Sequence, residues 1–156
     1  MNVLVVLFVS TGIATLVIRM ISHQYNLSAA ARIGMSVMLL FTALGHFIFA
    51  RGMSMMVPDF IPFKIEMVYL TGIIEIAAAI GLQLPKLRLL TAWLLILFFV
   101  LILPSNVKAA MEHIDMYKAN YQGTGAAYLW FRIPLQLFFI AWVYFSTIKV
   151  QQRKLS

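Results

Sequence analysis

Four polar side chains stand inside long apolar stretches of the sequence, where a polar group is energetically unfavourable. Glu75, His46, Arg132 and Gln136 each lie in a stretch apolar enough to cross a bilayer. A charge at the bilayer centre costs about 2.5–3.5 kcal/mol even on lenient insertion scales. Such side chains therefore face the interior of a helical bundle, where an ionisable group indicates a binding or proton-transfer site.

Counting residues from the ends of these stretches places the four side chains at similar depths. At about 1.5 Å per residue, Glu75 lies about 12 Å and His46 about 6 Å from the same boundary. Arg132 and Gln136 are four residues apart on one helix face, at about 6 and 12 Å. We predict an ion pair between Arg132 and Glu75, with His46 and Gln136 beside it and Asn106 at the rim. These five residues form the predicted ligand- or proton-binding cluster.

The predicted cluster offers proton exchange and recognition of a small polar group. Histidine titrates near neutral pH, and arginine binds oxyanions through two parallel donors. A structural role stays open for each residue, because polar contacts also hold transmembrane helices together, at about 0.6 kcal/mol each. Arg132 is also shallow enough to reach the headgroups. We assign no catalytic residue and no metal ligand, since His23, His46 and His113 lack metal-ligand spacing.

The composition excludes a water-soluble globular protein. Hydrophobic residues make up 63% of the 156 residues and charged residues 11%, whereas average soluble chains carry roughly 25% charged residues. The absence of cysteine excludes disulfides, iron–sulfur clusters and thiolate zinc sites within this sequence. The 12 Lys and Arg residues are scattered between apolar stretches, which argues against nucleic acid as a partner. The predicted partner is the lipid bilayer.

Five apolar stretches predict an all-α fold, a polytopic transmembrane helical bundle that forms a single membrane domain over residues 1–156. A bilayer-spanning helix needs roughly 20 residues, and in lipid a helix satisfies its own backbone hydrogen bonds. The predicted spans are residues 2–21, 33–50, 67–84, 89–107 and 128–148. Arg19 is the first cation and follows the first apolar run, which favours a retained helix over a cleaved signal peptide.

The charges between the predicted spans indicate which side of the membrane each loop occupies. One side collects seven cations and no acid: Arg19, Arg32, Lys86, Arg88, Lys149, Arg153 and Lys154. The other side collects five cations, Arg51, Lys64, Lys108, Lys118 and Arg132, offset by Asp59, Glu66, Glu112 and Asp115. Cytoplasmic loops are enriched in Lys and Arg. The sequence therefore predicts an outside N-terminus and an inside C-terminus.

The second outer loop carries apolar residues at helical spacing. Val107, Met111, Ile114 and Tyr117 recur every three or four residues, with charged residues on the other faces. This pattern predicts an amphipathic helix on the membrane surface that stops near Asn120.

Five short motifs carry a resemblance to a known family over about residues 30–148. They are Gly45-His46-Phe47, Pro58-Asp59-Phe60-Ile61-Pro62, Gly72-Ile73-Ile74-Glu75, Leu103-Pro104-Ser105-Asn106 and Arg132-Ile133-Pro134-Leu135-Gln136. In their order and spacing the sequence resembles DoxX-like integral membrane proteins. The resemblance implies a bundle of four family spans, here preceded by an extra N-terminal helix, in a bacterial inner membrane. It also implies kinship with membrane subunits associated with thiosulfate:quinone oxidoreductase and, more distantly, with membrane chaperones.

Three functions follow as hypotheses, and whether the protein is an enzyme stays open. The first is a redox-linked membrane subunit whose polar cluster binds a quinone headgroup or a small anion. The second is a small proton-coupled transporter with Glu75 as the titrating site. The third is a non-catalytic scaffold or assembly factor that contacts another membrane or redox protein. Quinone is the one cofactor that we consider.

Overall fold

The computed structural model describes residues 3–155, and the regular structure in that range is helical. Its elements are α1 (Val3–Ser22), α2 (Leu27–Ile48), α3 (Ala50–Met56), α4 (Lys64–Gly81), α5 (Arg88–Leu101), α6 (Leu103–Met111), α7 (Ala126–Val143), the π-helix η1 (Tyr144–Ile148) and α8 (Lys149–Leu155). A single isolated bridge joins Asp115 to Asn120 within this range. The all-α prediction is confirmed, while Asn2, the predicted start of the first span, lies outside the described residues.

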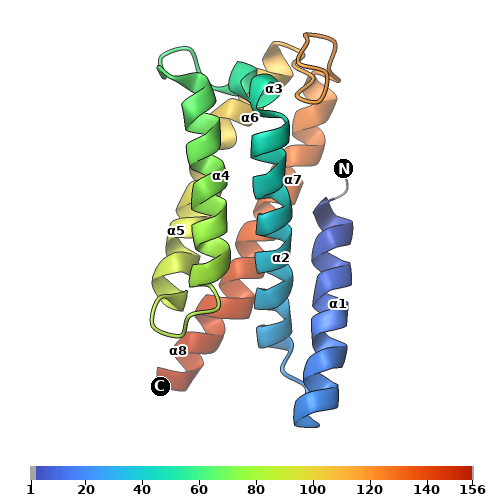
Figure 1. The fold of residues 1–156 in the computed structure, drawn as a ribbon, viewed down its shortest axis with the longest axis vertical. Coiled ribbons are helices and arrows are strands. Elements are labelled where there is room, and N and C mark those ends of the chain that lie inside the picture. Colours follow the sequence, from blue (N-terminus) through green and yellow to red (C-terminus); the bar gives the residue numbers. More distant parts are fainter. Residues whose placement is uncertain (1–2, 156) are drawn as a thin grey trace.

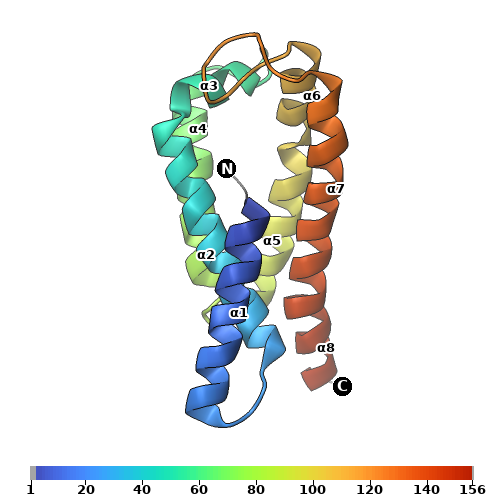
Figure 2. The same cartoon turned by 90° about the vertical axis from the view of Figure 1, so that its right-hand side faces the viewer.

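The long helices pack side by side with their connections at the two ends of the bundle. Helix α2 lies between α1 and α4, while α5, α6 and α7 form the opposite side (Figures 1 and 2). We call one end the α3 end, which comprises α3, residues 57–63, α6 and residues 112–125. The other is the α8 end, which comprises residues 23–26, residues 82–87 and α8. Helix α2 runs toward the α3 end, whereas α4 and α7 run away from it.

The start of α2 differs from the sequence prediction for a local reason. Helix α2 begins at Leu27 rather than near residue 33, because the Asn26 side chain accepts a hydrogen bond from the Ala29 amide at 3.1 Å and caps the helix. Arg32 therefore lies inside α2 and is buried, rather than in a loop as its place in the charge count implied.

The predicted surface helix ending near Asn120 is wrong. Helix α6 ends at Met111, and the chain then turns through His113 and Ala119, whose φ angles of 52° and 50° are incompatible with a continuing α-helix. The His113 carbonyl instead accepts a hydrogen bond from the Gly123 amide at 2.6 Å. This compact turn closes the α3 end.

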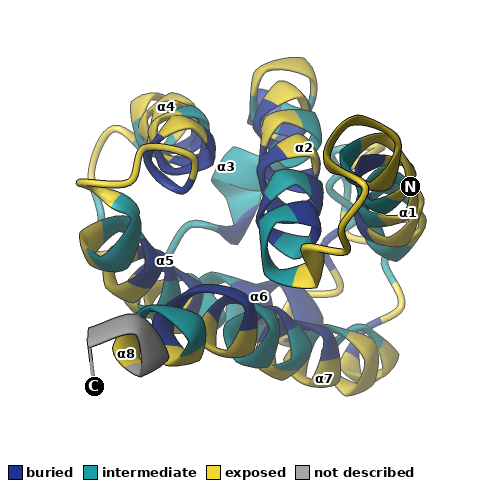
Figure 3. Ribbon diagram, turned by 90° about the horizontal axis from the view of Figure 1, so that it is seen from below, coloured by how far each residue is buried: buried dark blue, intermediate teal, exposed yellow. Residues whose placement is uncertain are grey.

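The hydrophobic core is concentrated in the half of the bundle nearer the α8 end. Leu7 of α1, Leu39 of α2, Leu82 after α4 and Ile148 of η1 are each 0% exposed and belong to one cluster, together with buried residues of α5 and α7. Figure 3 shows the buried residues on helix faces turned toward the bundle centre and exposed residues on the outside. The other half has a much smaller cluster around Met56, so side chains pack more sparsely there.

Within residues 3–155, four helices are long and apolar enough to cross a membrane. They are Val3–Ser22, Leu27–Ile48, Arg88–Met111 and Ala126–Gln152. Large apolar side chains on their outer faces, such as Ile13, Leu97 and Leu137, are more than half exposed. Contiguous apolar faces of this kind suit lipid rather than water, which supports a membrane location. Helix α4 has 18 residues but carries Lys64, Glu66 and Glu75, so it is more polar than these four.

Two glycines allow close approach between segments that are distant in sequence. A Cβ at Gly72 of α4 would lie 3.0 Å from the Cβ of His46, so glycine lets α4 approach α2 at that histidine. A Cβ at Gly52 of α3 would overlap the backbone carbonyl of Met116. Gly52 is therefore required where α3 packs on residues 112–125.

The Gly52 contact gives a test of this packing. Gly52→Ala is expected to lower the free energy of unfolding by about 1–3 kcal/mol, the usual cost of overpacking. A Cβ at Gly12 meets nothing within 4 Å, so Gly12→Ala serves as the matched control and is expected to be neutral or stabilising by about 0.5–1 kcal/mol. Both values are measured by denaturant titration in micelles. Equal stability of the two variants would show that α3 does not pack in this way.

Candidate functional site

The half of the bundle nearer the α3 end contains a cavity of about 810 Å³. Helices α2 to α7 contribute lining residues, and Val3 at the start of α1 adds to its edge. Figure 2 shows that α1 reaches only part of the way toward the α3 end, beside this region. Most of the lining is apolar, and the polar side chains are few. They are Thr42, His46, Thr71, Glu75, Ser105, Tyr117, Tyr128 and Arg132.

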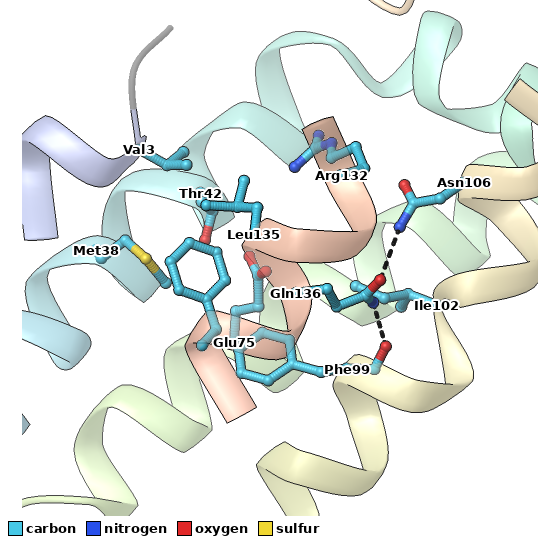
Figure 4. Close-up of a pocket in the computed structure, with 11 residues that line it drawn as sticks. Val3, Met38, Thr42, Glu75, Phe99, Ile102, Asn106, Arg132, Leu135 and Gln136 are labelled. Atoms are coloured by element: carbon cyan, nitrogen blue, oxygen red, sulfur yellow. Dashed lines mark hydrogen bonds between the residues drawn. The ribbon is translucent and has the colours of Figure 1, made fainter. Parts of the chain in front are cut away.

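A second, smaller cavity of about 70 Å³ adjoins the large one and brings the remaining cluster residues into the site. Glu75, Asn106, Arg132 and Gln136 all line it (Figure 4). Glu75 and Arg132 also line the large cavity. With His46 in the wall of the large cavity, the five residues of the predicted cluster therefore lie in one region. They come from α2, α4, α6 and α7.

Glu75 is the most deeply buried ionisable group of the site, at 6% exposed. The Nε2 atom of His46 lies 3.4 Å from its Oε2 atom, which is an ion-pair distance when the histidine is protonated. The same Oε2 atom is buried and has no hydrogen-bond partner among the described residues. A buried carboxylate oxygen without a hydrogen bond is costly, so this oxygen is the site's strongest unused acceptor.

The other ring nitrogen of His46 contacts a threonine hydroxyl of α4. The Nδ1 atom lies 2.9 Å from Thr71 Oγ1, which is also 2.7 Å from the Val68 carbonyl. The hydroxyl has a single proton, so when it donates to Val68, Nδ1 is the donor to Thr71. The contact with Thr71 orients the imidazole ring with Nε2 toward Glu75.

The predicted ion pair between Arg132 and Glu75 is wrong. Among the described residues no ion pair joins them, and Glu75 is paired with His46 instead. The Nε atom of Arg132 donates to the Tyr128 hydroxyl at 3.0 Å, and its guanidinium lies over the Tyr128 ring, 5.3 Å from the centroid. Arg132 thus lines the same cavity but is engaged by the residue one turn earlier in α7.

Helix direction explains why histidine, not arginine, meets the carboxylate. Side chains on an α-helix tilt toward its N-terminus. Helices α2 and α4 run in opposite directions, so His46 and Glu75 tilt toward each other. Helix α7 runs parallel to α4, so Arg132 tilts toward the α3 end, in the same direction as Glu75. Counting depth along each helix therefore placed Glu75, His46 and Arg132 in one region, but it predicted that Arg132 rather than His46 pairs with Glu75.

Asn106 and Gln136 belong to a chain of hydrogen bonds that all donate in one direction. Arg132 donates to Tyr128, whose hydroxyl donates to Asn106 Oδ1 at 3.1 Å. The Asn106 amide donates to Gln136 Oε1 at 3.5 Å, and Gln136 Nε2 donates to the Phe99 carbonyl. Figure 4 shows the inner part of this chain between α7, α6 and α5. These contacts satisfy Asn106 and Gln136, so both have a structural role here.

Sequence analysis missed five polar residues that line the large cavity, Thr42, Thr71, Ser105, Tyr117 and Tyr128. Two of them, Thr71 and Tyr128, make hydrogen bonds to predicted site residues. Each lies four residues before a predicted site residue, Thr71 before Glu75 and Tyr128 before Arg132. Side chains at this spacing share a helix face, so the spacing was the signal that could have identified them. Among residues 3–155, no three potential metal ligands of the His, Asp or Glu type come together.

A lysine holds the loop that covers the α3 end of the cavity. The Nζ atom of Lys108 donates to Asp59 Oδ1 at 2.6 Å and to the Val57 carbonyl at 3.1 Å. Lys64 donates to the same Asp59 oxygen at 2.5 Å. Hydrogen bonds from Lys108 and Lys64 lower the pKa of Asp59 from 3.8 to about 2. These contacts join residues 57–63 to α6 and to the start of α4.

The protein is an α-helical bundle in which four helices of the described range are long and apolar enough to cross a membrane. A cluster of polar side chains lines its mainly apolar cavity. The chain belongs to the family described as "Domain of unknown function (DUF8561)", whose model matches residues 35–147. His46, Glu75, Asn106, Arg132 and Gln136 all fall within the matched segment, whereas α1 lies outside it. No curated protein and no solved structure matches the chain.

The Asp59 contacts predict a pH dependence of the loop. Because the folded-state pKa is about 2 and the ordinary value 3.8, the carboxylate contributes stability above pH 3.8 that is lost as the pH falls toward 2. Lys108→Met is expected to raise the pKa of Asp59 toward its ordinary value, as measured by NMR titration of the carboxyl carbon. Lys118→Met, which alters an exposed lysine at the same end, should leave it unchanged. An unaltered Asp59 titration in Lys108→Met would contradict the contact.

The hydrogen-bond chain predicts a role for the Tyr128 hydroxyl. Tyr128→Phe removes the acceptor of Arg132 and the donor to buried Asn106, and is expected to lower the free energy of unfolding by about 1–3 kcal/mol. Tyr121 is 64% exposed, so Tyr121→Phe should change it by less than about 0.5 kcal/mol. Denaturant titration of both variants checks this, and a neutral Tyr128→Phe would remove the chain as a structural element.

Proposed function

We propose that this protein binds a lipid-soluble molecule with a polar, hydrogen-bonding head, for which a quinone is the best-fitting class, in the cavity near the α3 end. The observation that carries this proposal is the Glu75 carboxylate, which is 6% exposed and has one buried oxygen without a hydrogen bond at the wall of a cavity of about 810 Å³. Ligand pockets are typically about 300–1,000 Å³, mainly apolar, with a few polar groups that fix orientation.

The unpaired Glu75 oxygen gives the cavity an acceptor for a quinone head in its reduced form. The hydroxyl of a quinol donates a hydrogen bond, and oxidation of the quinol to a quinone releases protons as well as electrons. Glu75 Oε2 has no hydrogen-bond partner among the described residues, so it can accept from such a hydroxyl and take up its proton, with His46 Nε2 3.4 Å away. Arg132, in the opposite wall on α7, can donate to the other oxygen of the head.

Electrons in such a reaction would be handled by another protein. This sequence has no cysteine, and the described residues bring no metal-ligand group together. The proposed role is a redox-linked membrane subunit that binds the quinone or quinol and exchanges protons with it, beside a partner subunit that handles electrons. The resemblance of the motifs around His46, Glu75 and Arg132 to DoxX-like membrane proteins supports this role.

The proposed topology has five membrane spans, with the α8 end in the cytoplasm. Helix α4 would be the fifth span, because it runs antiparallel to α2 and packs along it. Its acidic Glu75 is offset by His46 of α2, which lowers the cost of placing α4 in lipid. The α8 end carries Arg19, Lys86 and Lys149, and positively charged loops favour the cytoplasm. A bacterial inner membrane is proposed from the DoxX-like resemblance.

A non-catalytic scaffold is the second candidate, favoured by exposed aromatic side chains at the α3 end. Phe60 and Phe63 are 83% and 75% exposed in the loop next to the cavity, and Trp130 is 82% exposed on α7. Aromatic residues are enriched both in membrane interfaces and at protein contacts. A partner that binds Phe60 and Phe63 and is indifferent to Glu75 would favour this second function.

Glu75→Gln separates the two candidates. The substitution keeps the shape but removes the charge, and is expected to weaken binding of a short-chain quinol at least about tenfold, as for loss of a hydrogen bond to a charged group. Glu66→Gln is the matched control, because Glu66 is an exposed acid on the same helix and should bind as wild type. Binding is measured by fluorescence quenching of the purified protein.

Mass spectrometry of molecules retained after gentle purification provides an independent check. Wild type and Glu66→Gln should carry a quinone, whereas Glu75→Gln should lose it. Equal retention in all three, or an empty wild-type protein that also binds no added quinone, would reject the quinone site and leave the scaffold.

A further inference from the structure

Arg32 is a buried cation near the α8 end of the bundle, whereas the Glu75 site lies in the half nearer the α3 end. It is 9% exposed, in the second turn of α2, close to the α8 end. Its Nη1 atom donates to the Ser146 carbonyl of η1 at 3.3 Å, while its buried Nε atom has no hydrogen-bond partner within residues 3–155. A guanidinium has five donors and no acceptor, so this contact satisfies little of its hydrogen-bonding capacity.

Among the described residues, no acid neutralises the charge of Arg32. Within the described residues Arg32 makes no ion pair, and the ion pairs that do occur involve Glu75, Asp59 and Glu112, nearer the α3 end. Burial disfavours the charged guanidinium of Arg32, and the positive charge of Arg88 acts on it unfavourably as well. A buried charge is tolerated when it is paired, and an unpaired one beside a like charge is strongly unfavourable.

A chain of hydrogen bonds one turn from Arg32 links α2 to Arg88. Ser36, one turn further along α2, donates to the Ala79 carbonyl at 2.7 Å and accepts from Gln83 Nε2 at 2.8 Å. Arg88 donates to the Gln83 and Leu82 carbonyls, each at 3.1 Å. Together with the Arg32 contact to Ser146, these contacts outline a polar patch between α2, residues 82–88 and η1, with two arginines and no carboxylate.

The π-helix η1 supplies the third wall of this patch. Its Ser146 and Thr147 are 9% and 2% exposed, and their hydroxyls lie 3.4 Å apart. A π-turn disturbs the regular helical hydrogen bonding, and such turns occur frequently at functional sites. The Ser146 carbonyl of this π-turn accepts the hydrogen bond from Arg32, so η1 and the buried cation are in direct contact.

We propose that Arg32 and Arg88 flank a binding site for a phosphate group, between α2, residues 82–88 and η1. A phosphate provides the missing negative charge and several acceptor oxygens, which match the donors of two arginines. Basic groups between transmembrane helices near a membrane surface are typical sites for acidic lipid headgroups. The phosphate comes either from such a lipid or from free inorganic phosphate. This site is independent of the proposed quinone site.

The test uses the full-length protein in nanodiscs and varies the source of phosphate. Wild type in phosphatidylcholine nanodiscs containing phosphatidylglycerol is expected to unfold at a higher temperature than in phosphatidylcholine alone. Inorganic phosphate added to phosphatidylcholine nanodiscs forms the second arm. A rise with the lipid alone identifies a headgroup, and a rise with inorganic phosphate identifies a free anion. No rise in either arm rejects the site.

Variants assign the effect to Arg32. Arg32→Gln is expected to bind phosphatidylglycerol about fivefold more weakly in native mass spectrometry, from about 1 kcal/mol for each basic residue near an anionic surface. Arg19→Gln is the control, because Arg19 is an exposed cation of α1 at the same end, outside the proposed site, and should retain nearly full binding. Arg32→Lys keeps the charge and serves if Arg32→Gln does not fold; its binding should be weaker than that of wild type and Arg19→Gln. Equal adduct levels in wild type and the folded Arg32 variants would overturn the proposal.

Discussion

Charged groups inside an apolar bundle must find partners, and this constraint organises the whole molecule. Glu75 is positioned by His46, and His46 by Thr71, so one carboxylate fixes the contact between α2 and α4. Gly72 lets the two helices come close enough for that contact. The pairing is incomplete, since one Glu75 oxygen keeps no hydrogen bond. A buried carboxylate that keeps one oxygen without a hydrogen bond is typical of a ligand- or proton-binding site.

The two halves of the bundle are held together by different interactions. Near the α8 end, residues such as Leu39, Leu82 and Ile148 are fully buried and hold the helices together. Near the α3 end, the helices separate around a large cavity, and polar contacts replace apolar packing. The chain from Arg132 through Tyr128 to Asn106 links α7 to α6, and Lys108 fastens residues 57–63 to α6. A rigid half thus supports an open half, which is how a small bundle can maintain a ligand-sized space.

Arginines in this protein occupy two contrasting environments. Arg132 is partly exposed and engaged by the ring and hydroxyl of Tyr128, so its charge is spread over a local contact. Arg32 is buried beside Arg88 with no acid in reach, so its charge is not compensated within the described residues. One arginine, Arg132, therefore contributes to the wall of the cavity, whereas the other, Arg32, leaves an uncompensated positive charge near the α8 end. Local packing, and not residue type, decides between these roles.

The sequence by itself determined the all-helical fold, the apolar stretches and the identity of the polar residues within them, because hydropathy and the need to satisfy backbone hydrogen bonds are local properties. It also brought Glu75, His46 and Arg132 to one half of the bundle, since depth follows from counting residues. Only the tertiary structure decided which of them pair. The pairing of Glu75 with His46 depends on the relative directions of α2, α4 and α7, which turn side chains toward or away from one another. The burial of Arg32 likewise depended on where Asn26 starts α2 and on how η1 packs against it.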